Sequence, residues 1–177
     1  MQWQPFRFRN AAYDLSHLHP IAVTYQQPAK GDRPTRCYSV EVSFGLHCFT
    51  RSAAPDEGRD PALLYSDSRE TRVFDFRRYE LSKQLPAIVR DLSRRKCYHS
   101  GKGNFFTVVS LDDQGRRIEY DVFFEASRSA KRGVVRLFVQ SAYVRDAQHS
   151  SRPRLKPIGI YVILHNTLHK IPIKIQQ

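Results

Sequence analysis

The feature of this sequence that most constrains its fold is a regular alternation of apolar and polar side chains. In residues 38–47, every second position is apolar: Tyr38, Val40, Val42, Phe44 and Leu46. Successive side chains of a β-strand point to opposite faces of a sheet, so this period of two predicts a strand with one buried face. Residues 118–125 repeat the pattern. The chain is therefore expected to form a sheet that covers a core on one side.

Three of the expected strands follow one another as a meander, in residues 105–111, 118–125 and 134–144. The segment Asp-Asp-Gln-Gly at 112–115 is typical of a hairpin turn, and Ala-Lys-Arg-Gly at 130–133 predicts the next turn.

Two more strands are expected near the end of the sequence. The short apolar run Ile158–Leu164 predicts one of them. The alternation over residues 171–175 indicates a short edge strand, because Pro172 has no N–H group to donate to a central ladder.

One stretch predicts a helix. Its apolar side chains recur every three or four positions: Leu81, Leu85, Ile88, Val89 and Leu92. Ser82 can cap this helix, and Pro86 falls near its first turn. Strands and helix together predict an α+β fold, a bent antiparallel sheet of five or six strands with one main helix.

The length of 177 residues is suited to a single domain that spans the whole chain. Two loops are expected on its surface. Residues 51–70 form an acidic, proline-containing loop, and residues 146–157 form a basic loop.

Positive charge is concentrated in the last 52 residues. Lys and Arg exceed Asp and Glu by twelve in the whole chain and by nine in residues 126–177, where Asp146 is the only acid. Such an excess favours a polyanionic partner, and nucleic acid is the natural one. A membrane surface is a weaker alternative, because no amphipathic helix with a broad apolar face adjoins the basic segment.

Composition also excludes some classes of protein. No stretch approaches the roughly 18 apolar residues that cross a bilayer, so no membrane association is expected. The first ten residues lack the apolar run of a secretory signal. The three cysteines, Cys37, Cys48 and Cys97, are an odd number and indicate reduced thiols, hence a cytoplasmic protein.

Candidate phosphate contacts come from two segments. The predicted helix carries a stripe of cations away from its apolar side chains, and two more follow it: Lys83, Arg90, Arg94, Arg95 and Lys96. The basic loop adds Arg152, Arg154 and Lys156. A solvated basic face explains such a stripe as readily as a row of nucleic-acid contacts does.

Histidines supply the candidates for proton transfer. Metal-independent RNA cleavage needs a base, an acid and a cation beside the phosphate. His47 lies on the polar face of a strand, and His99 precedes a Gly-Lys-Gly loop whose Lys102 and backbone N–H groups can wrap an oxyanion. His47, His99 and Lys102 are therefore the catalytic candidates of an endoribonuclease. The loop lacks Walker A spacing, which excludes hydrolysis of nucleoside triphosphates.

No metal ion or other cofactor is expected. There is no CxxC pair, and the adjacent His47 and Cys48 would point to opposite faces of one strand. The carboxylates Glu119, Asp121 and Glu125 share one strand face, where ion pairs across the sheet with Arg117 or Arg136 explain them better than Mg²⁺ does.

The alternative to an enzyme is a non-catalytic module that binds RNA or single-stranded DNA on exposed rings. Five aromatic residues alternate with the expected core positions: Phe49, Phe123, Phe138, Tyr143 and Tyr161. No RNA-recognition, KH or helix-turn-helix signature is present. An acidic protein is a further candidate partner for the same basic surface.

Overall fold

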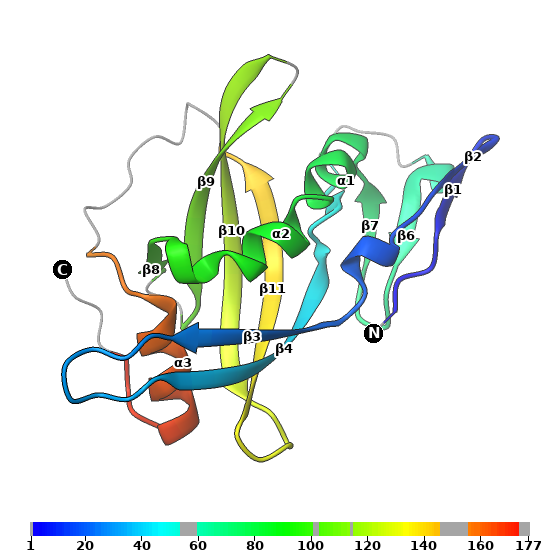
Figure 1. The fold of residues 1–177 in the computed structure, drawn as a ribbon. Coiled ribbons are helices and arrows are strands. Elements are labelled where there is room, and N and C mark those ends of the chain that lie inside the picture. Colours follow the sequence, from blue (N-terminus) through cyan, green and yellow to red (C-terminus); the bar gives the residue numbers. More distant parts are fainter. Residues whose placement is uncertain (1, 54–59, 101–102, 114, 146–155, 174–177) are drawn as a thin grey trace.

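Six strands form one sheet that curls around two helices (Figure 1). The computed structural model describes residues 2–53, 60–100, 103–113, 115–145 and 156–173. The strands stand in the order β3-β4-β11-β10-β9-β8. Their bounds are β3 Ile21–Gln27, β4 Arg36–His47, β8 Cys97–His99, β9 Phe105–Asp113, β10 Arg116–Arg128 and β11 Val134–Val144.

The neighbouring strands of this sheet are antiparallel except for one pair. β11 runs parallel to β4, with Val134 opposite Ser39 and Leu137 opposite Val42. The predicted meander is confirmed, because β9, β10 and β11 pair in sequence order through two hairpins. The α+β class and the bent sheet of six strands are confirmed as well, with a sheet that is mixed rather than wholly antiparallel.

Two smaller sheets lie beside the end of β4, at the right of Figure 1. One contains β5 (Thr50–Arg51), β7 (Thr71–Phe74) and β6 (Leu64–Ser66), so part of the segment expected as a surface loop is a strand. The other is the hairpin of β1 (Phe6–Phe8) and β2 (Ala11–Tyr13). Aromatic rings fill the space between them: Trp3, Phe6, Phe49, Tyr65 and Phe74.

The helices are α1 (Phe76–Ser82), α2 (Leu85–Arg90) and α3 (Ile160–His169). Single 3-10 turns occur at Ser16–Leu18, Pro61–Leu63 and Leu92–Arg94. The helix predicted from the spacing of its leucines is present as α2 and the turn after it, with Pro86 in the first turn. Ser82 does not cap it, because that residue ends α1 and Gln84 is the N-cap of α2.

The prediction of a strand over Ile158–Leu164 is wrong, because most of this segment is the start of α3. Ile160, Ile163 and Leu164 are buried, and their spacing of three and four residues places them on one side of a helix. That side packs on β10 and β11 within the curled sheet. Residues 171–173, expected in an edge strand, have no regular secondary structure.

The core lies on the concave face of the sheet, which we call the inner face. It combines alternate residues of the strands with the apolar sides of α2 and α3, among them Val42, Phe44, Phe124, Leu137 and Ile163. Within the described ranges, no helix is long and apolar enough to cross a membrane.

Candidate nucleic-acid interface

A row of stacked aromatic rings crosses the outer face of the sheet, opposite the core. It consists of Tyr98 on β8, Phe106 on β9, Phe123 on β10 and Tyr143 on β11, and we call it the aromatic row. Successive ring centroids are 5.3, 5.3 and 5.5 Å apart, with planes tilted by 29°, 28° and 15°. Such offset stacking stabilises each pair by about 0.5–1.5 kcal/mol beyond burial.

Strand register creates the aromatic row. Phe105 and Phe124 point into the core, so Phe106 and Phe123 next to them point to the outer face. Tyr98 pairs with Phe106, and Phe106 pairs with Phe123. Tyr143 lies two residues beyond Ser141, the partner of Phe123, and reaches Phe123 diagonally.

The two ends of the aromatic row differ. At β11, the guanidinium carbon of Arg78 lies 5.6 Å from the centre of the Tyr143 ring, as a cation–π contact. At the other end, Tyr98 belongs to β8, the edge strand, and is partly exposed. The inner rings turn their faces to one another, and Phe106 is only 8% exposed. Tyr98 is thus the ring at which the row ends on the edge strand.

Three of the predicted phosphate contacts lie in the segments that flank β8. Lys96 is exposed and immediately precedes the strand. The Arg94 side chain is 86% exposed, with a loose contact of 3.8 Å to Asp91. Ile158 forms an antiparallel bridge with Cys97, which brings the exposed Lys156 alongside β8.

The remaining predicted cations are placed differently. The Lys83 Nζ lies 2.7 Å from a carboxylate oxygen of Glu80, which raises the pKa of Lys83. Arg95 contacts Asp91 at 3.1 Å. Arg90 is exposed on α2. Arg152 and Arg154 lie outside the described residues.

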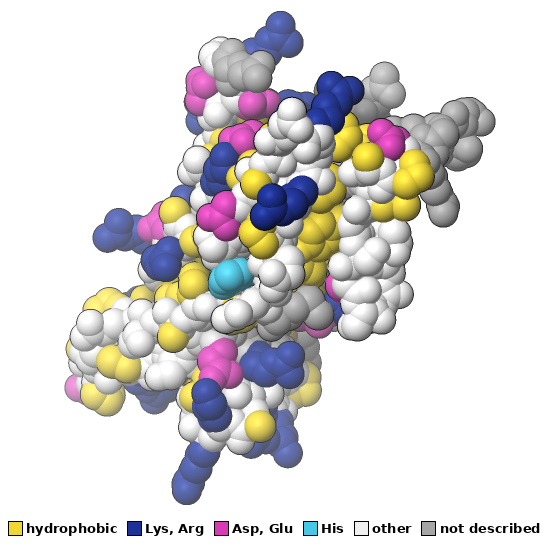
Figure 2. Space-filling view, turned by 90° about the vertical axis from the view of Figure 1, so that its right-hand side faces the viewer, with side chains coloured by type: hydrophobic (Ala, Val, Ile, Leu, Met, Phe, Trp, Pro, Cys, Tyr) yellow, Lys and Arg dark blue, Asp and Glu magenta, His cyan; other side chains and the backbone are white. Residues whose placement is uncertain are grey.

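Much of the positive charge of residues 126–145 is found at the hairpin between β10 and β11. Arg128, Lys131 and Arg132 are exposed there, and Lys131 lies 2.6 Å from Glu41. Figure 2 shows Lys and Arg side chains gathered at the end of the molecule where Figure 1 places this hairpin. Higher on the same face, basic and acidic side chains alternate.

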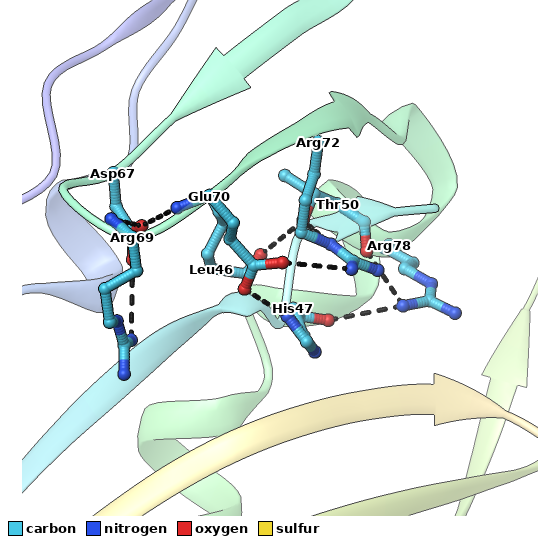
Figure 3. Close-up of polar contacts among 8 residues, drawn as sticks. All are labelled: Leu46, His47, Thr50, Asp67, Arg69, Glu70, Arg72 and Arg78. Carbon is cyan, nitrogen blue, oxygen red and sulfur yellow. Dashed lines mark hydrogen bonds and ion pairs between the residues drawn. The ribbon is translucent and has the colours of Figure 1, made fainter. Parts of the chain in front are cut away.

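His47 belongs to a network of polar contacts at the end of β4 (Figure 3). Its Nε2 lies 2.6 Å from Oε1 of Glu70, whose other carboxylate oxygen is 3.4 Å from Arg72. This hydrogen bond lowers the pKa of Glu70. Arg78 donates to the backbone oxygens of His47 and Thr50, at 3.3 and 2.8 Å. The network ties the end of β4 to the small sheet of β5, β6 and β7.

The structure does not bring His47 and His99 together. His47 pairs with Ser141 on β11, and β10 and β9 stand between β11 and β8, which carries His99. Four strand spacings amount to about 19 Å along the sheet. His99 also has the opposite orientation to Tyr98, with its ring 5.1 Å from the buried Phe105. Lys102 lies outside the described residues.

No group of three or more His, Cys, Asp and Glu side chains in the described part of the chain is arranged to hold a metal ion. Among the carboxylates of β10, Asp121 is buried and lies 3.9 Å from Arg145. Glu125 accepts a hydrogen bond from Gln140. These contacts cross the sheet, as the sequence predicts, although Arg145 rather than Arg136 or Arg117 is the partner of Asp121.

Sequence reasoning identified only part of the aromatic row. It included Phe123 and Tyr143 but not Tyr98 or Phe106, because apolar side chains occupy both faces of β9 and hide its alternation. Phe49 was expected among the exposed rings and is fully buried. Phe138 is partly buried and packs over Gly45, and Tyr161 lies on α3.

Residues 5–168 match the model of the YjaZ family. No curated protein and no solved structure shows significant similarity to the chain. The matched residues run from the start of β1 almost to the end of α3 and include the whole curled sheet. The chain therefore belongs to the YjaZ family.

Proposed function

We propose that this protein binds single-stranded nucleic acid, RNA or DNA, at the β8 edge of its sheet and does not cleave it. The observation that carries the proposal is the end of the aromatic row at Tyr98, on a strand whose flanking segments carry the exposed cations Arg94, Lys96 and Lys156. A base stacks on Tyr98 as the next ring of the row, and the phosphates on either side of that base contact the three cations.

The energetics of such a site are favourable. Stacking of one base on an aromatic side chain contributes about 1–3 kcal/mol and tolerates any base. Each Lys or Arg that contacts a phosphate releases a condensed counterion, so affinity depends steeply on salt. A cytoplasmic location, in which the free thiols stay reduced, is part of this proposal.

The endoribonuclease hypothesis has less support. A two-histidine mechanism needs both imidazoles at one phosphate, and His47 and His99 are four strands apart with opposite orientations. His47 is instead bonded to Glu70.

Replacing Tyr98 by leucine is expected to weaken binding of a short end-labelled RNA or DNA strand by about 5- to 150-fold, the equivalent of one lost stacking contact. Tyr98→Phe keeps the ring and should bind like the unchanged protein. Phe76→Leu is the matched control, because Phe76 is an exposed ring on α1 whose aromatic contacts are Phe8, Tyr13 and Phe74 rather than rings of the row. The measurement is gel retardation and fluorescence anisotropy, with and without EDTA.

The outcomes of this measurement separate the hypotheses. Equal loss of affinity in Tyr98→Leu and Tyr98→Phe would show that the ring is not a stacking platform. Cleavage that persists in EDTA would favour the histidine mechanism instead. Absence of both retardation and cleavage would favour an acidic protein partner.

The salt dependence of binding provides a second prediction. Lys96→Gln should reduce the slope of log affinity against log salt concentration by about 0.7, which is one phosphate contact on a single strand. Lys83→Gln is the control, because its ammonium group is already bonded to Glu80 and should leave the slope unchanged. The measurement is a titration at several salt concentrations. An equal slope in Lys96→Gln and the unchanged protein would show that Lys96 does not contact a phosphate.

A further inference from the structure

A pocket of about 440 Å³ lies between the β3–β4 hairpin and α3. Figure 1 shows these two elements next to each other, and a hydrogen bond of 2.7 Å from the Tyr161 hydroxyl to the Gln26 carbonyl oxygen joins them. The pocket is lined by Arg33 and Arg36 from the hairpin side and by His165 and Asn166 from the helix. Its volume lies within the range of small-molecule sites.

The polar groups of this pocket are mainly donors. No acidic side chain lines it. Among the described residues, neither Arg33 nor Arg36 forms an ion pair with a carboxylate, although Asp32 precedes Arg33 in sequence. Two guanidinium groups that no carboxylate of the described residues neutralises, together with the side-chain amide of Asn166, favour an anion, and their planar N–H groups suit the oxygens of a phosphate.

Aromatic rings provide the other wall. Tyr38 and Tyr161 line the pocket, with ring centroids 6.2 Å apart. Their hydroxyl groups are used elsewhere, since Tyr161 donates to Gln26 and Tyr38 donates to the Gln27 side chain at 3.3 Å. The rings are therefore fixed in position. Tyr38 is only 4% exposed, so Tyr161 presents the accessible apolar surface beside the two arginines.

We propose that this pocket binds a phosphate monoester that carries a flat ring, either a free nucleoside monophosphate or the phosphorylated end of a strand. The phosphate accepts hydrogen bonds from Arg33, Arg36 and Asn166, and the base lies against the ring of Tyr161. This site is separate from the proposed stacking site at Tyr98 and does not depend on it.

His165 makes the affinity depend on pH. Burial, the neighbouring His169 and Arg36 lower the pKa of His165, in that order of importance. The His165 and His169 rings are 4.4 Å apart on α3, and Arg33, Arg36 and the two tyrosines are the other titratable groups that line the pocket. A bound phosphate attracts the proton that these cations repel, so it raises the pKa of His165. By linkage, protonation of His165 strengthens binding as the pH falls, whereas protonation of the phosphate itself, whose second pKa is about 6, opposes this gain.

The experiment is isothermal titration with adenosine monophosphate, inorganic phosphate and adenosine. Adenosine monophosphate should bind more tightly than inorganic phosphate or adenosine alone.

Arg36→Gln should weaken the affinity for adenosine monophosphate at least tenfold, since a hydrogen bond to a charged group is lost. The control is Arg7→Gln, which replaces an exposed arginine on β1 and should leave the affinity for the monophosphate unchanged. His165→Asn should lose affinity for the monophosphate relative to the unchanged protein as the pH falls from 7.5 to 6. Thermal unfolding curves establish that each variant is folded.

Oligonucleotides with a 5′-phosphate or a 5′-hydroxyl group distinguish the two sources of the phosphate. If only the phosphorylated strand binds through Arg36, the ligand is a strand end. Binding of adenosine as tight as that of its monophosphate would overturn the proposal, and so would unchanged binding in Arg36→Gln or no binding of any phosphorylated probe. Tyr98→Leu should leave binding of the monophosphate intact. A negative result for the pocket is therefore distinct from a negative result for the stacking site at Tyr98.

Discussion

Replacing Phe49 by alanine is expected to lower the free energy of unfolding by about 3–5 kcal/mol, the usual cost of truncating a fully buried phenylalanine. Phe49 is 0% exposed, and its ring touches Trp3 and Tyr65 with centroid distances of 5.1 and 5.2 Å. Alanine leaves a cavity between the β1–β2 hairpin, the small sheet and the end of β4. Urea unfolding, followed by tryptophan fluorescence and circular dichroism, measures the loss.

The matched control is Phe76→Ala. Phe76 is 37% exposed, so its truncation removes less buried area and should cost far less stability than that of Phe49. Equal losses in the two variants would contradict the burial of Phe49. Equal losses would indicate that Phe49 is exposed, as the alternation of the sequence alone predicts.

Replacing Gly45 by alanine is expected to lower the free energy of unfolding by about 3 kcal/mol, near the upper end for overpacking. A Cβ atom on Gly45 would lie 2.8 Å from the Gln140 carbonyl oxygen and 2.9 Å from Cζ of Phe138. The first of these atoms is backbone and cannot move aside without disturbing the pairing of β4 with β11. Urea unfolding with a native-state hydrogen-exchange measurement on β11 tests both the size and the place of the effect.

Gly159→Ala is the control for this prediction. Gly159 precedes α3, and no atom lies within 4 Å of the position that its Cβ would occupy. Its replacement should change stability by a few tenths of a kcal/mol, as expected for a substitution away from packed or strained sites. A similar small change in Gly45→Ala would mean that β4 and β11 are farther apart than the structure has them.

The alternation of side chains was sufficient to predict the large sheet. It located β4 and β10 to within a few residues because each of these strands has one buried and one solvated face over much of its length, and apolar runs beside turn residues located β9 and β11. Turn residues defined the two hairpins. Nothing local, however, indicates that β11 lies parallel to β4, since that pairing joins segments distant in sequence.

The misassigned α3 illustrates a limit of short apolar patterns. Residues 158–164 are rich in β-branched side chains, which favour strands, and the run is too short for its period to decide between strand and helix. Tertiary packing favours the helix, because Ile160, Ile163 and Leu164 then lie on one side and pack together against the concave face of the sheet. The second turn of α3 is polar and gives little periodic signal.

The candidate interface was predictable in its composition but not in its assembly. Charge counting indicated a polyanionic partner, and alternation indicated some of the rings. The bridge between Cys97 and Ile158 brings Lys156 close to β8. No sequence pattern predicts a contact of that kind. The separation of His47 from His99 likewise follows from strand order, which a single sequence does not contain.

The single parallel pairing has a consequence during synthesis of the protein. β3 and β4 leave the ribosome early, but β11, the strand that pairs with β4 on its other side, is made only after the whole region from β5 to β10. At the usual 5–20 residues per second this delay lasts roughly 5–20 s. During that time β4 is an open edge with one apolar face, the kind of strand that pairs with copies of itself. Nascent chains that stall before β11 should therefore aggregate, or recruit chaperones, far more readily than chains released after it.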